Sequence, residues 1–327
     1  MKKNMFIKGL TGLVASTLIA GAAFAAEMKT VAIANLVDVP PLVETKEGII
    51  EGLKLRGWVV GENLTIDYKQ ANGKMDTNAQ IVKKFIGQNP DVLVAITTPT
   101  AQAAVANTKD IPIVFAAITD PVKAELIAQY IKPGKNVTGV SDAAPIATQL
   151  ALFKKIVPGL TKIGFIYNPG LDNALATLGW LKEESAKMGI IVVESAAPTV
   201  NEVLIATKRL VGKVDAIYVP NDTTVISAIA GIIKIGQDTD TPIFAGETGH
   251  VEVGVIASVG LDYFAHGIVA GGMVADILDG QTVGDIDALV AYKNVTDFKI
   301  VVNLASAVKM GVTIPADVIA SATQVFE

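Results

Sequence analysis

Four short polar segments follow apolar runs in this sequence, and their side chains could bind a small molecule. They are Thr97-Thr98-Pro99, Thr119-Asp120-Pro121, Asn168-Pro169 and Asn221-Asp222-Thr223. A proline after such residues is typical of the start of a helix, where backbone N–H groups are unpaired. Any one segment alone is better explained as a helix cap, which contributes about 1 kcal/mol of stability. Their recurrence in both halves of the chain favours a binding site.

Sequence motifs for catalysis are scarce. The chain has no Walker A sequence, no G-x-G-x-x-G after the first expected strand and no G-x-S-x-G. His250 and His266 stand in unrelated contexts without any cysteine, so we interpret both as structural or surface residues and expect no metal site. Asp120, Asp222 and Glu247 could serve acid–base chemistry or hold an ammonium group. A binding protein that is not an enzyme and needs no cofactor is the simpler prediction.

The first 25 residues have the pattern of a secretion signal. A basic start with Lys2, Lys3 and Lys8 precedes an uncharged apolar core at residues 9–21, and Ala-Phe-Ala at 23–25 fits signal peptidase. The alternative, a membrane anchor, is disfavoured because this core is shorter than the roughly 20 residues that span a bilayer. Without cysteine there is neither a lipidation site nor a disulfide. We therefore predict a signal peptide over residues 1–25 and a periplasmic location.

Composition limits the remaining possibilities. About 300 residues follow the signal, which is more than a single hydrophobic core usually contains, so two domains are expected. The hydrophobic share is 51%, but charges recur often enough that no later segment is expected to cross a membrane. A net charge of -5 without a Lys/Arg cluster argues against nucleic acid as a partner. A soluble protein, expected to be a monomer, is predicted.

Apolar runs of strand length alternate with amphipathic stretches, which is typical of an α/β fold with parallel strands covered on both faces. The expected strands are Thr30–Leu36, Leu64–Tyr68, Val92–Ile96, Ile113–Ile118, Lys162–Tyr167, Ile190–Val193, Ala216–Val219, Pro242–Ala245 and Val253–Val259. The expected helices include Thr77–Gln88, Ala174–Met188, Glu202–Val211 and Gly267–Leu278.

An internal repeat indicates two similar lobes. Lys29–Asn35 (KTVAIAN) matches Lys162–Asn168 (KIGFIYN), and Asp91–Ala104 matches Asp215–Ala228. In both halves, an Asp-x-Pro strand follows the longer match, so the order of the segments is the same. We predict two doubly wound parallel-sheet lobes that face each other across a cleft. Ligands of such sheets bind beyond the carboxyl ends of the strands, where the four polar segments fall.

The motifs TPTAQAA, KDIPIVF, TDPV, NVTGVSD, KIGFIYNP and VDAIYVPNDTTVISA, in this order, cover nearly all of the chain after the predicted signal. Together they resemble the tryptophan/tyrosine-type substrate-binding proteins of ABC transporters. The resemblance implies a type I periplasmic-binding-protein fold, with a hinged interlobe cleft that closes on its ligand. It also implies amino acids, often aromatic, as cargo and a permease as partner. Two loops depart from the usual pattern, GETGHV at 246–251 and GLDYFAHG at 260–267.

This fold implies three chain crossings between the lobes, which we place near Gly139–Ser141, Gly260–Asp262 and Tyr292–Asn294. Lobe one would then comprise residues 26–140 and 262–292, and lobe two residues 141–261 and 293–327. The glycines of the segment 264–280 are expected to pack closely against the sheet of lobe one.

An amino acid ligand has a carboxylate, an ammonium and a side chain to be held. The carboxylate is expected at the helix that Thr98-Pro99 opens, with Thr98 acting as both helix cap and ligand contact. The ammonium is expected at Asp120 or Asp222, with Glu247 behind them. The candidate ligand-binding residues are Thr97, Thr98, Thr119, Asp120, Asn168, Asn221, Asp222, Thr223, Glu247 and Thr248.

Two other functions remain open from the sequence. The same fold could serve as a periplasmic sensor that presents its closed form to a receptor in place of a permease. A secreted enzyme that uses the carboxylates of the cleft is the less favoured alternative, and it predicts turnover of a bound metabolite.

Overall fold

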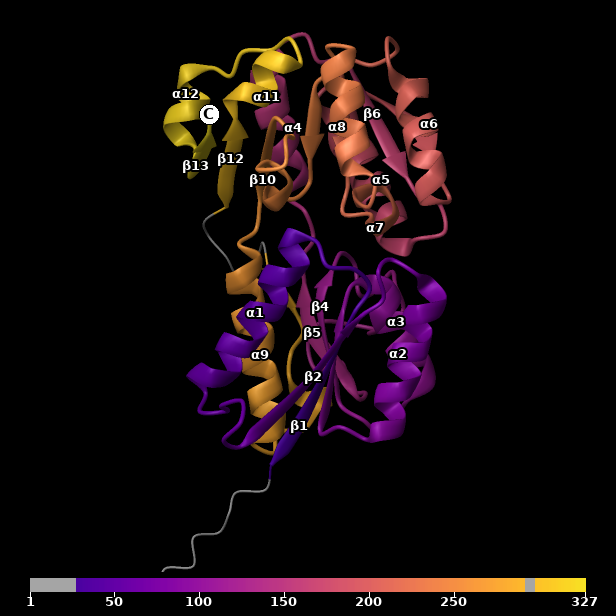
Figure 1. Cartoon of the computed structure of the whole chain (residues 1–327), viewed down its shortest axis with the longest axis vertical. Helices are drawn as coiled ribbons and strands as arrows, with labels where there is room; N and C mark the ends of the chain where they lie inside the picture. Colours follow the sequence, from indigo (N-terminus) through magenta and orange to yellow (C-terminus); the bar gives the residue numbers. More distant parts are fainter. Residues whose placement is uncertain (1–27, 292–297) are drawn as a thin grey trace, which may run out of the picture.

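The computed structural model describes residues 28–291 and 298–327. The predicted signal peptide and the expected third crossing at Tyr292–Asn294 lie outside the described residues. The described chain forms two α/β lobes that follow one another along the long axis of the molecule (Figure 1). None of the described helices is long and apolar enough to cross a membrane.

Lobe one contains a six-stranded sheet of order β11-β5-β4-β3-β1-β2, in which every pair of neighbours is parallel. Its strands are β1 (Lys29–Asn35), β2 (Leu64–Gln70), β3 (Val92–Ile96), β4 (Ile113–Ile118), β5 (Val137–Ser141) and β11 (Leu289–Val290). Its helices are α1 (Pro40–Leu55), α2 (Met75–Gln88), α3 (Thr98–Asn107) and α9 (Tyr263–Leu278), with the short 3-10 helix η2 (Val283–Asp285).

Two hydrophobic clusters cover the two faces of this sheet. One is built with α1 and α9, through residues such as Ile49 and Val274. The other is built with α2 and α3, through residues such as Phe85 and Ala104. β3 and β4 are buried along their whole length, which explains why their sequences are apolar without alternation.

Lobe two contains a four-stranded parallel sheet of order β7-β6-β8-β9 and a three-stranded sheet of order β10-β12-β13. The strands are β6 (Lys162–Tyr167), β7 (Ile191–Ala196), β8 (Ala216–Val219), β9 (Ile243–Ala245), β10 (Ala257–Gly260), β12 (Lys299–Asn303) and β13 (Gln324–Phe326). The helices are α4 (Ile146–Ile156), α5 (Asp172–Lys187), α6 (Val200–Leu210), α7 (Thr223–Ile226), α8 (Ile229–Asp238), η1 (Thr248–His250), α11 (Leu304–Lys309) and α12 (Ala316–Ser321). One buried cluster joins both sheets.

The prediction of two parallel-sheet α/β lobes is confirmed, and most expected strands agree with the structure within a few residues. The strand expected from Val253 is wrong at its start, because Val253 lies in a turn with 52% of its surface exposed. That strand begins at Ala257.

The described chain passes between the lobes at two places. β5 pairs within the sheet of lobe one, and the next helix, α4, packs into the core of lobe two. β10 pairs with β12 in lobe two, and α9 follows directly in lobe one. The carboxyl ends of β5 and β10 therefore both lie where the lobes meet, and the residues after them can contact either lobe.

Gly267 and Gly271 of α9 pack against helix α1, so the expectation that the glycines of this helix pack against the sheet is wrong. A Cβ added at Gly271 would lie 2.3 Å from the carbonyl oxygen of Ile49 and 3.0 Å from the Cα of Gly52. Gly267 meets Gly48 in the same way, with Cα at 2.9 Å from such a Cβ. The two helices run side by side in Figure 1. Backbones this close leave room only for hydrogen at each contact.

Candidate ligand-binding site

A narrow cavity lies between the lobes, and the space free of atoms within it and at its open mouth is about 360 Å³. The cavity is bounded mainly by segments that follow strand ends, as expected for open parallel sheets. Its lining residues are Val39, Leu42, Thr97, Thr98, Pro99, Ala117, Thr119, Asp142, Asn173, Asn221, Thr223, Ile226 and Glu247.

Six of the ten candidate ligand-binding residues line this cavity. They come from both lobes, and they are Thr97, Thr98, Thr119, Asn221, Thr223 and Glu247. The other four lie outside the lining and have contacts within the protein; they are Asp120, Asn168, Asp222 and Thr248.

Asp120 and Asp222 act as caps. Asp120 Oδ1 accepts hydrogen bonds from the N–H groups of Val122 and Lys123, at 3.2 Å and 3.0 Å. Asp222 Oδ1 accepts from the N–H of Thr224 at 2.9 Å, which caps α7. Burial raises the pKa of Asp222 to about 6, although hydrogen bonds from backbone N–H groups oppose this shift. The bonded oxygens of both carboxylates are thus committed to backbone donors.

Asn168 and Thr248 are also held within lobe two. Asn168 Nδ2 donates to Thr224 Oγ1 at 2.9 Å, and Asn168 Oδ1 accepts from the N–H of Gly170 at 2.9 Å. Thr248 starts η1, and its hydroxyl lies 3.5 Å from the carbonyl oxygen of Leu261. Both side chains are therefore bonded within the protein, outside the cavity lining.

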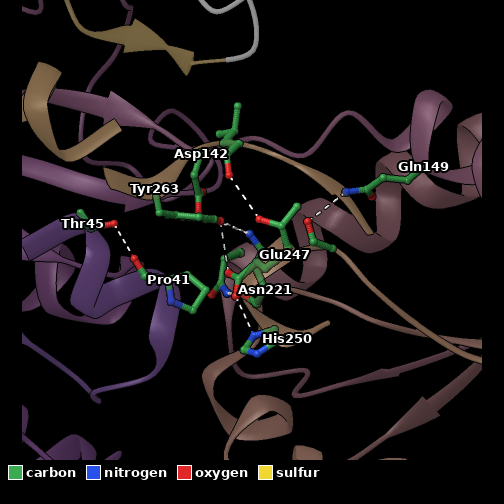
Figure 2. Close-up of polar contacts among 12 residues, drawn as sticks. Pro41, Thr45, Asp142, Gln149, Asn221, Glu247, His250 and Tyr263 are labelled. Atoms are coloured by element: carbon green, nitrogen blue, oxygen red, sulfur yellow. Dashed lines mark hydrogen bonds and ion pairs between the residues drawn. The ribbon is translucent and has the colours of Figure 1, made fainter. Parts of the chain in front are cut away.

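Asp142 is a cavity residue that the sequence analysis missed. It follows β5 directly and is only 3% exposed. Its Oδ2 accepts from the hydroxyl of Tyr263 at 3.0 Å and from Nδ2 of Asn221 at 3.3 Å. Burial and, second to it, the nearby Glu247 raise the pKa of Asp142 to about 7. Figure 2 shows Asp142, Tyr263, Asn221 and Glu247 gathered at one point.

Glu247 is the second buried acid of the cavity, with 3% of its surface exposed. Its Oε1 lies 3.3 Å from the hydroxyl of Tyr263. On the other side, His250 Nε2 lies 2.8 Å from Glu247 Oε2 (Figure 2). This is an ion-pair distance, but the two atoms are not oriented as a hydrogen bond. Two acids and one tyrosine hydroxyl therefore share the centre of the site.

Several buried oxygens of the cavity lining have no hydrogen-bond donor among the described residues. They are Asp142 Oδ1, Asn173 Oδ1, Asn221 Oδ1 and Glu247 Oε2. Buried polar atoms in folded proteins are nearly always paired, because an unpaired one costs about 1–3 kcal/mol. A group of unpaired acceptors that includes two acids suits a positively charged donor.

The N-terminus of α3 forms another part of the cavity lining. Thr97 has φ +82°, a left-handed conformation that is rare for threonine. Its hydroxyl lies 3.0 Å from the hydroxyl of Thr100, which donates to Asn78 Oδ1 at 2.9 Å. Thr98 is the first helical residue, so the expectation that it caps the helix was wrong. The first turn has no side-chain cap, which leaves N–H groups for an anion.

His266 fixes the backbone of a further wall residue. Ala117 has φ +54°, and its N–H donates to His266 Nε2 at 3.0 Å. Burial lowers the pKa of His266 to about 4, which keeps this acceptor nitrogen free of a proton near neutral pH. His266 thus has a structural role, as expected. Among the described residues, no group of three His, Cys, Asp or Glu side chains could hold a metal ion.

The two lobes also touch beside the cavity. Gln102 Nε2 of α3 donates to Asp172 Oδ2 of α5 at 2.7 Å. A Cβ added at Gly249, in lobe two, would lie 3.0 Å from the ring of Pro41 in α1. The lobes thus meet on more than one side of the cavity.

Comparison with known proteins identifies relatives of this chain. The tyrosine-binding protein of Clostridioides difficile (strain R20291) is 40% identical over 260 residues, which are 80% of this chain and 75% of that protein. A structure described as the ABC domain in complex with L-Trp, from Streptococcus pneumoniae, is 34% identical with a TM-score of 0.87. The match covers 92% of this chain and 100% of that one.

A third relative is a substrate-binding protein with adhesive properties from Clostridium difficile, in its ligand-free, open structure. It is 36% identical, with a TM-score of 0.69 over 91% of this chain and 99% of that one. The model of the family described as ABC transporter substrate binding protein matches residues 30–326. With two parallel-sheet lobes of the type I periplasmic-binding-protein fold around a polar cavity, this chain belongs to the family of ABC transporter substrate-binding proteins.

Proposed function

We propose that this chain is the periplasmic component of an ABC importer and captures a free amino acid, with aromatic ones preferred. The observation that carries the proposal is the set of unpaired acceptor oxygens in the cavity lining, which includes both buried acids. An ammonium group supplies three N–H donors and one positive charge to such a set. The tyrosine-binding relative and the L-Trp complex support the same ligand class.

The ammonium group is proposed to bind at Asp142 and Glu247. Both acids line the cavity; Asp142 Oδ1 has no donor, and Glu247 Oε2 accepts no hydrogen bond although His250 Nε2 lies 2.8 Å away. Asp120 and Asp222 were the first candidates from the sequence, but they lie outside the lining and cap backbone segments. A charge-assisted hydrogen bond contributes about 1.5–3 kcal/mol, so two such bonds provide a large part of the affinity.

The carboxylate is proposed to bind at the N-terminus of α3. Thr97, Thr98 and Thr119 line this side of the cavity, and the first turn of α3 lacks a side-chain cap. Free N–H groups and the helix dipole both favour a negative charge there. The negative and positive ends of the ligand would thus meet different parts of the cavity lining.

The side chain of the ligand is proposed to lie against the apolar part of the lining. Val39 and Leu42 belong to lobe one, and Ile226 belongs to lobe two. Burial of a ring contributes about 1.5–3 kcal/mol. Together with the two charged ends, and after the cost of immobilisation, this gives an affinity of roughly micromolar order.

Closure of the lobes is proposed to accompany binding. At similar sequence identity, the structure superposes better on the L-Trp complex than on the ligand-free, open relative, with TM-scores of 0.87 and 0.69. We propose that the two lobes move as two bodies. One body comprises residues 26–140 with 262–292, and the other comprises residues 141–261 with 293–327, because the described chain changes lobe after β5 and after β10. A ligand held by both bodies shifts the equilibrium towards the closed form.

The closed form would be read by the permease of the importer. Export by the predicted signal peptide over residues 1–25 would place the protein in the periplasm, and we propose that it works there as a monomer. The charge of -5 gives no basis for a nucleic acid partner.

Thermal unfolding in the presence of candidate ligands tests the ligand class. L-tryptophan and L-tyrosine are expected to raise the midpoint, since a ligand at 100 times its Kd adds about 2.7 kcal/mol to the free energy of unfolding. N-acetyl-L-tryptophan, which lacks the ammonium group, is the matched control and should have little effect. A midpoint raised only by sugars or nucleosides would exclude amino acids as the ligand class.

A further inference from the structure

The two acids of the cavity depend on one hydroxyl group. Asp142 Oδ2 lies 3.0 Å and Glu247 Oε1 lies 3.3 Å from the oxygen of Tyr263. A tyrosine hydroxyl has one proton, so it donates to only one of these acids at a time. Asn221 Nδ2 contacts the same hydroxyl at 3.1 Å and Asp142 at 3.3 Å (Figure 2).

The two acids have different charged neighbours. His250 reaches Glu247 at 2.8 Å, from the side opposite Tyr263. Glu44 of α1 is close enough to interact repulsively with Glu247. Lys299 forms an ion pair with Asp262 at 2.7 Å. Among the described residues, no cationic side chain forms an ion pair with Asp142.

Nor do the remaining neighbours supply a charge to Asp142. Tyr218 lies in the core of lobe two and donates its hydroxyl proton to Gln149 Oε1 at 2.8 Å. Asn221 and Asn173 are neutral amides. In the empty protein, a buried carboxylate at Asp142 would thus face a second acid with only neutral donors around it, which favours its protonated form.

We infer that Tyr263 is the positioning residue of the ammonium subsite, and that ligand capture expels a proton from Asp142 to the solvent. This inference rests on the proposed function. In the step, the O–H bond of the Asp142 carboxyl group breaks, and its proton passes to water or buffer. The carboxylate that remains accepts an N–H of the ligand's ammonium group, which keeps all of its own protons.

The electrostatics of the site agree with this exchange. Burial, followed by the charge of Glu247, raises the pKa of Asp142 to about 7, while the hydrogen bond from Tyr263 opposes the shift. The empty protein therefore holds this proton below pH 7. An ammonium group in the subsite lowers the pKa of Asp142, because an opposite charge favours the ionised form.

Proton release makes affinity depend on pH. Below pH 7 the association constant is expected to rise by up to tenfold per pH unit, since one proton leaves for each ligand bound. Above pH 7 the curve should become flat, because Asp142 is already ionised in the empty protein. The opposite slope would mean proton uptake.

The test is isothermal titration of the mature protein with L-tryptophan and L-tyrosine between pH 5.5 and 8.5. Measurements at each pH in two buffers with different ionisation enthalpies give the number of protons released. Wild type is expected to release close to one proton at pH 5.5 and fewer as pH rises past 7. Asp142→Asn should release none, and Asp110→Asn, which removes an exposed acid elsewhere, should behave as wild type.

Tyr263→Phe tests the positioning role separately. Loss of the hydroxyl removes the donor that favours the ionised form of Asp142, so the bend in the pH profile should move to higher pH. Affinity at pH 8 should fall about tenfold or more, because neither acid is then held by the hydroxyl. An unchanged profile and affinity would overturn the role of Tyr263.

The outcomes separate this inference from the proposed function. Binding of an aromatic amino acid without buffer-dependent heat, and with affinity independent of pH, would overturn the proton exchange while leaving the proposed function intact. No binding of either amino acid at any pH would overturn both.

Discussion

Replacement of Gly271 by alanine should destabilise the protein, although alanine favours helices. In the interior of an exposed helix, Gly→Ala is worth up to about 1 kcal/mol of added stability. Here the added Cβ would lie 2.3 Å from the carbonyl oxygen of Ile49 and 3.0 Å from the Cα of Gly52. Both atoms belong to the backbone of α1 and cannot rotate away. Overpacking of this kind costs typically 1–3 kcal/mol or more, so the steric cost exceeds the gain.

Gly272 provides the matched control, because it lies in the same helix and a Cβ there would have no neighbour within 4 Å. Gly272→Ala should therefore stabilise the protein by up to about 1 kcal/mol. Urea unfolding of both variants against wild type measures the difference between them, which we expect to be at least ~2 kcal/mol. Equal effects of the two substitutions would refute the close contact between α1 and α9.

Three further predictions concern the cavity. Thr98→Ala should weaken the binding of L-tryptophan about tenfold, because one hydrogen bond to a charged group is lost. An equal loss of affinity for L-tryptophanamide in titrations would show that the carboxylate is not bound there. Asp120→Asn should leave L-tryptophan affinity unchanged in calorimetry because Asp120 holds only backbone N–H groups outside the cavity, whereas a tenfold loss would return it to the site. The pKa of Asp142 is raised to about 7 in the folded protein, so the bound proton adds to the free energy of unfolding at low pH. This contribution is lost as pH rises through 7. Urea unfolding should thus show wild type losing roughly 3 kcal/mol relative to Asp142→Asn between pH 5 and 8, and parallel curves would contradict this.

The fold was predictable because its signals are local. β3 and β4 are buried over their whole length, so their sequences are continuous apolar runs that read directly as parallel strands. The repeat of KTVAIAN in KIGFIYN corresponds to β1 and β6, strands of the two separate sheets. Neither feature depends on contacts between distant segments.

The site was predictable only in part, because side-chain direction depends on details that the pattern does not show. Asp120 and Asp142 both follow strand ends, yet only Asp142 lines the cavity. β4 has a register shift between Phe115 and Ile118, with Ala117 in a left-handed conformation, and such bulges re-aim the residues near them. From the sequence, a chain crossing is expected at β5. No proline follows Asp142 to mark it as a polar strand end, as Pro121 does after Asp120. The contact of Tyr263 with Asn221 depends on how the lobes meet.

The interlocked glycines of α1 and α9 have a consequence for how relatives of this protein can diverge. Gly48 and Gly52 meet Gly267 and Gly271 at backbone distance, although the two segments are far apart in the chain. A larger residue on either helix requires the helices to separate, and α9 begins at Tyr263, the residue that contacts both acids of the cavity. Alignments of the family should therefore show these four positions substituted together, in lineages whose ligand preference has also changed.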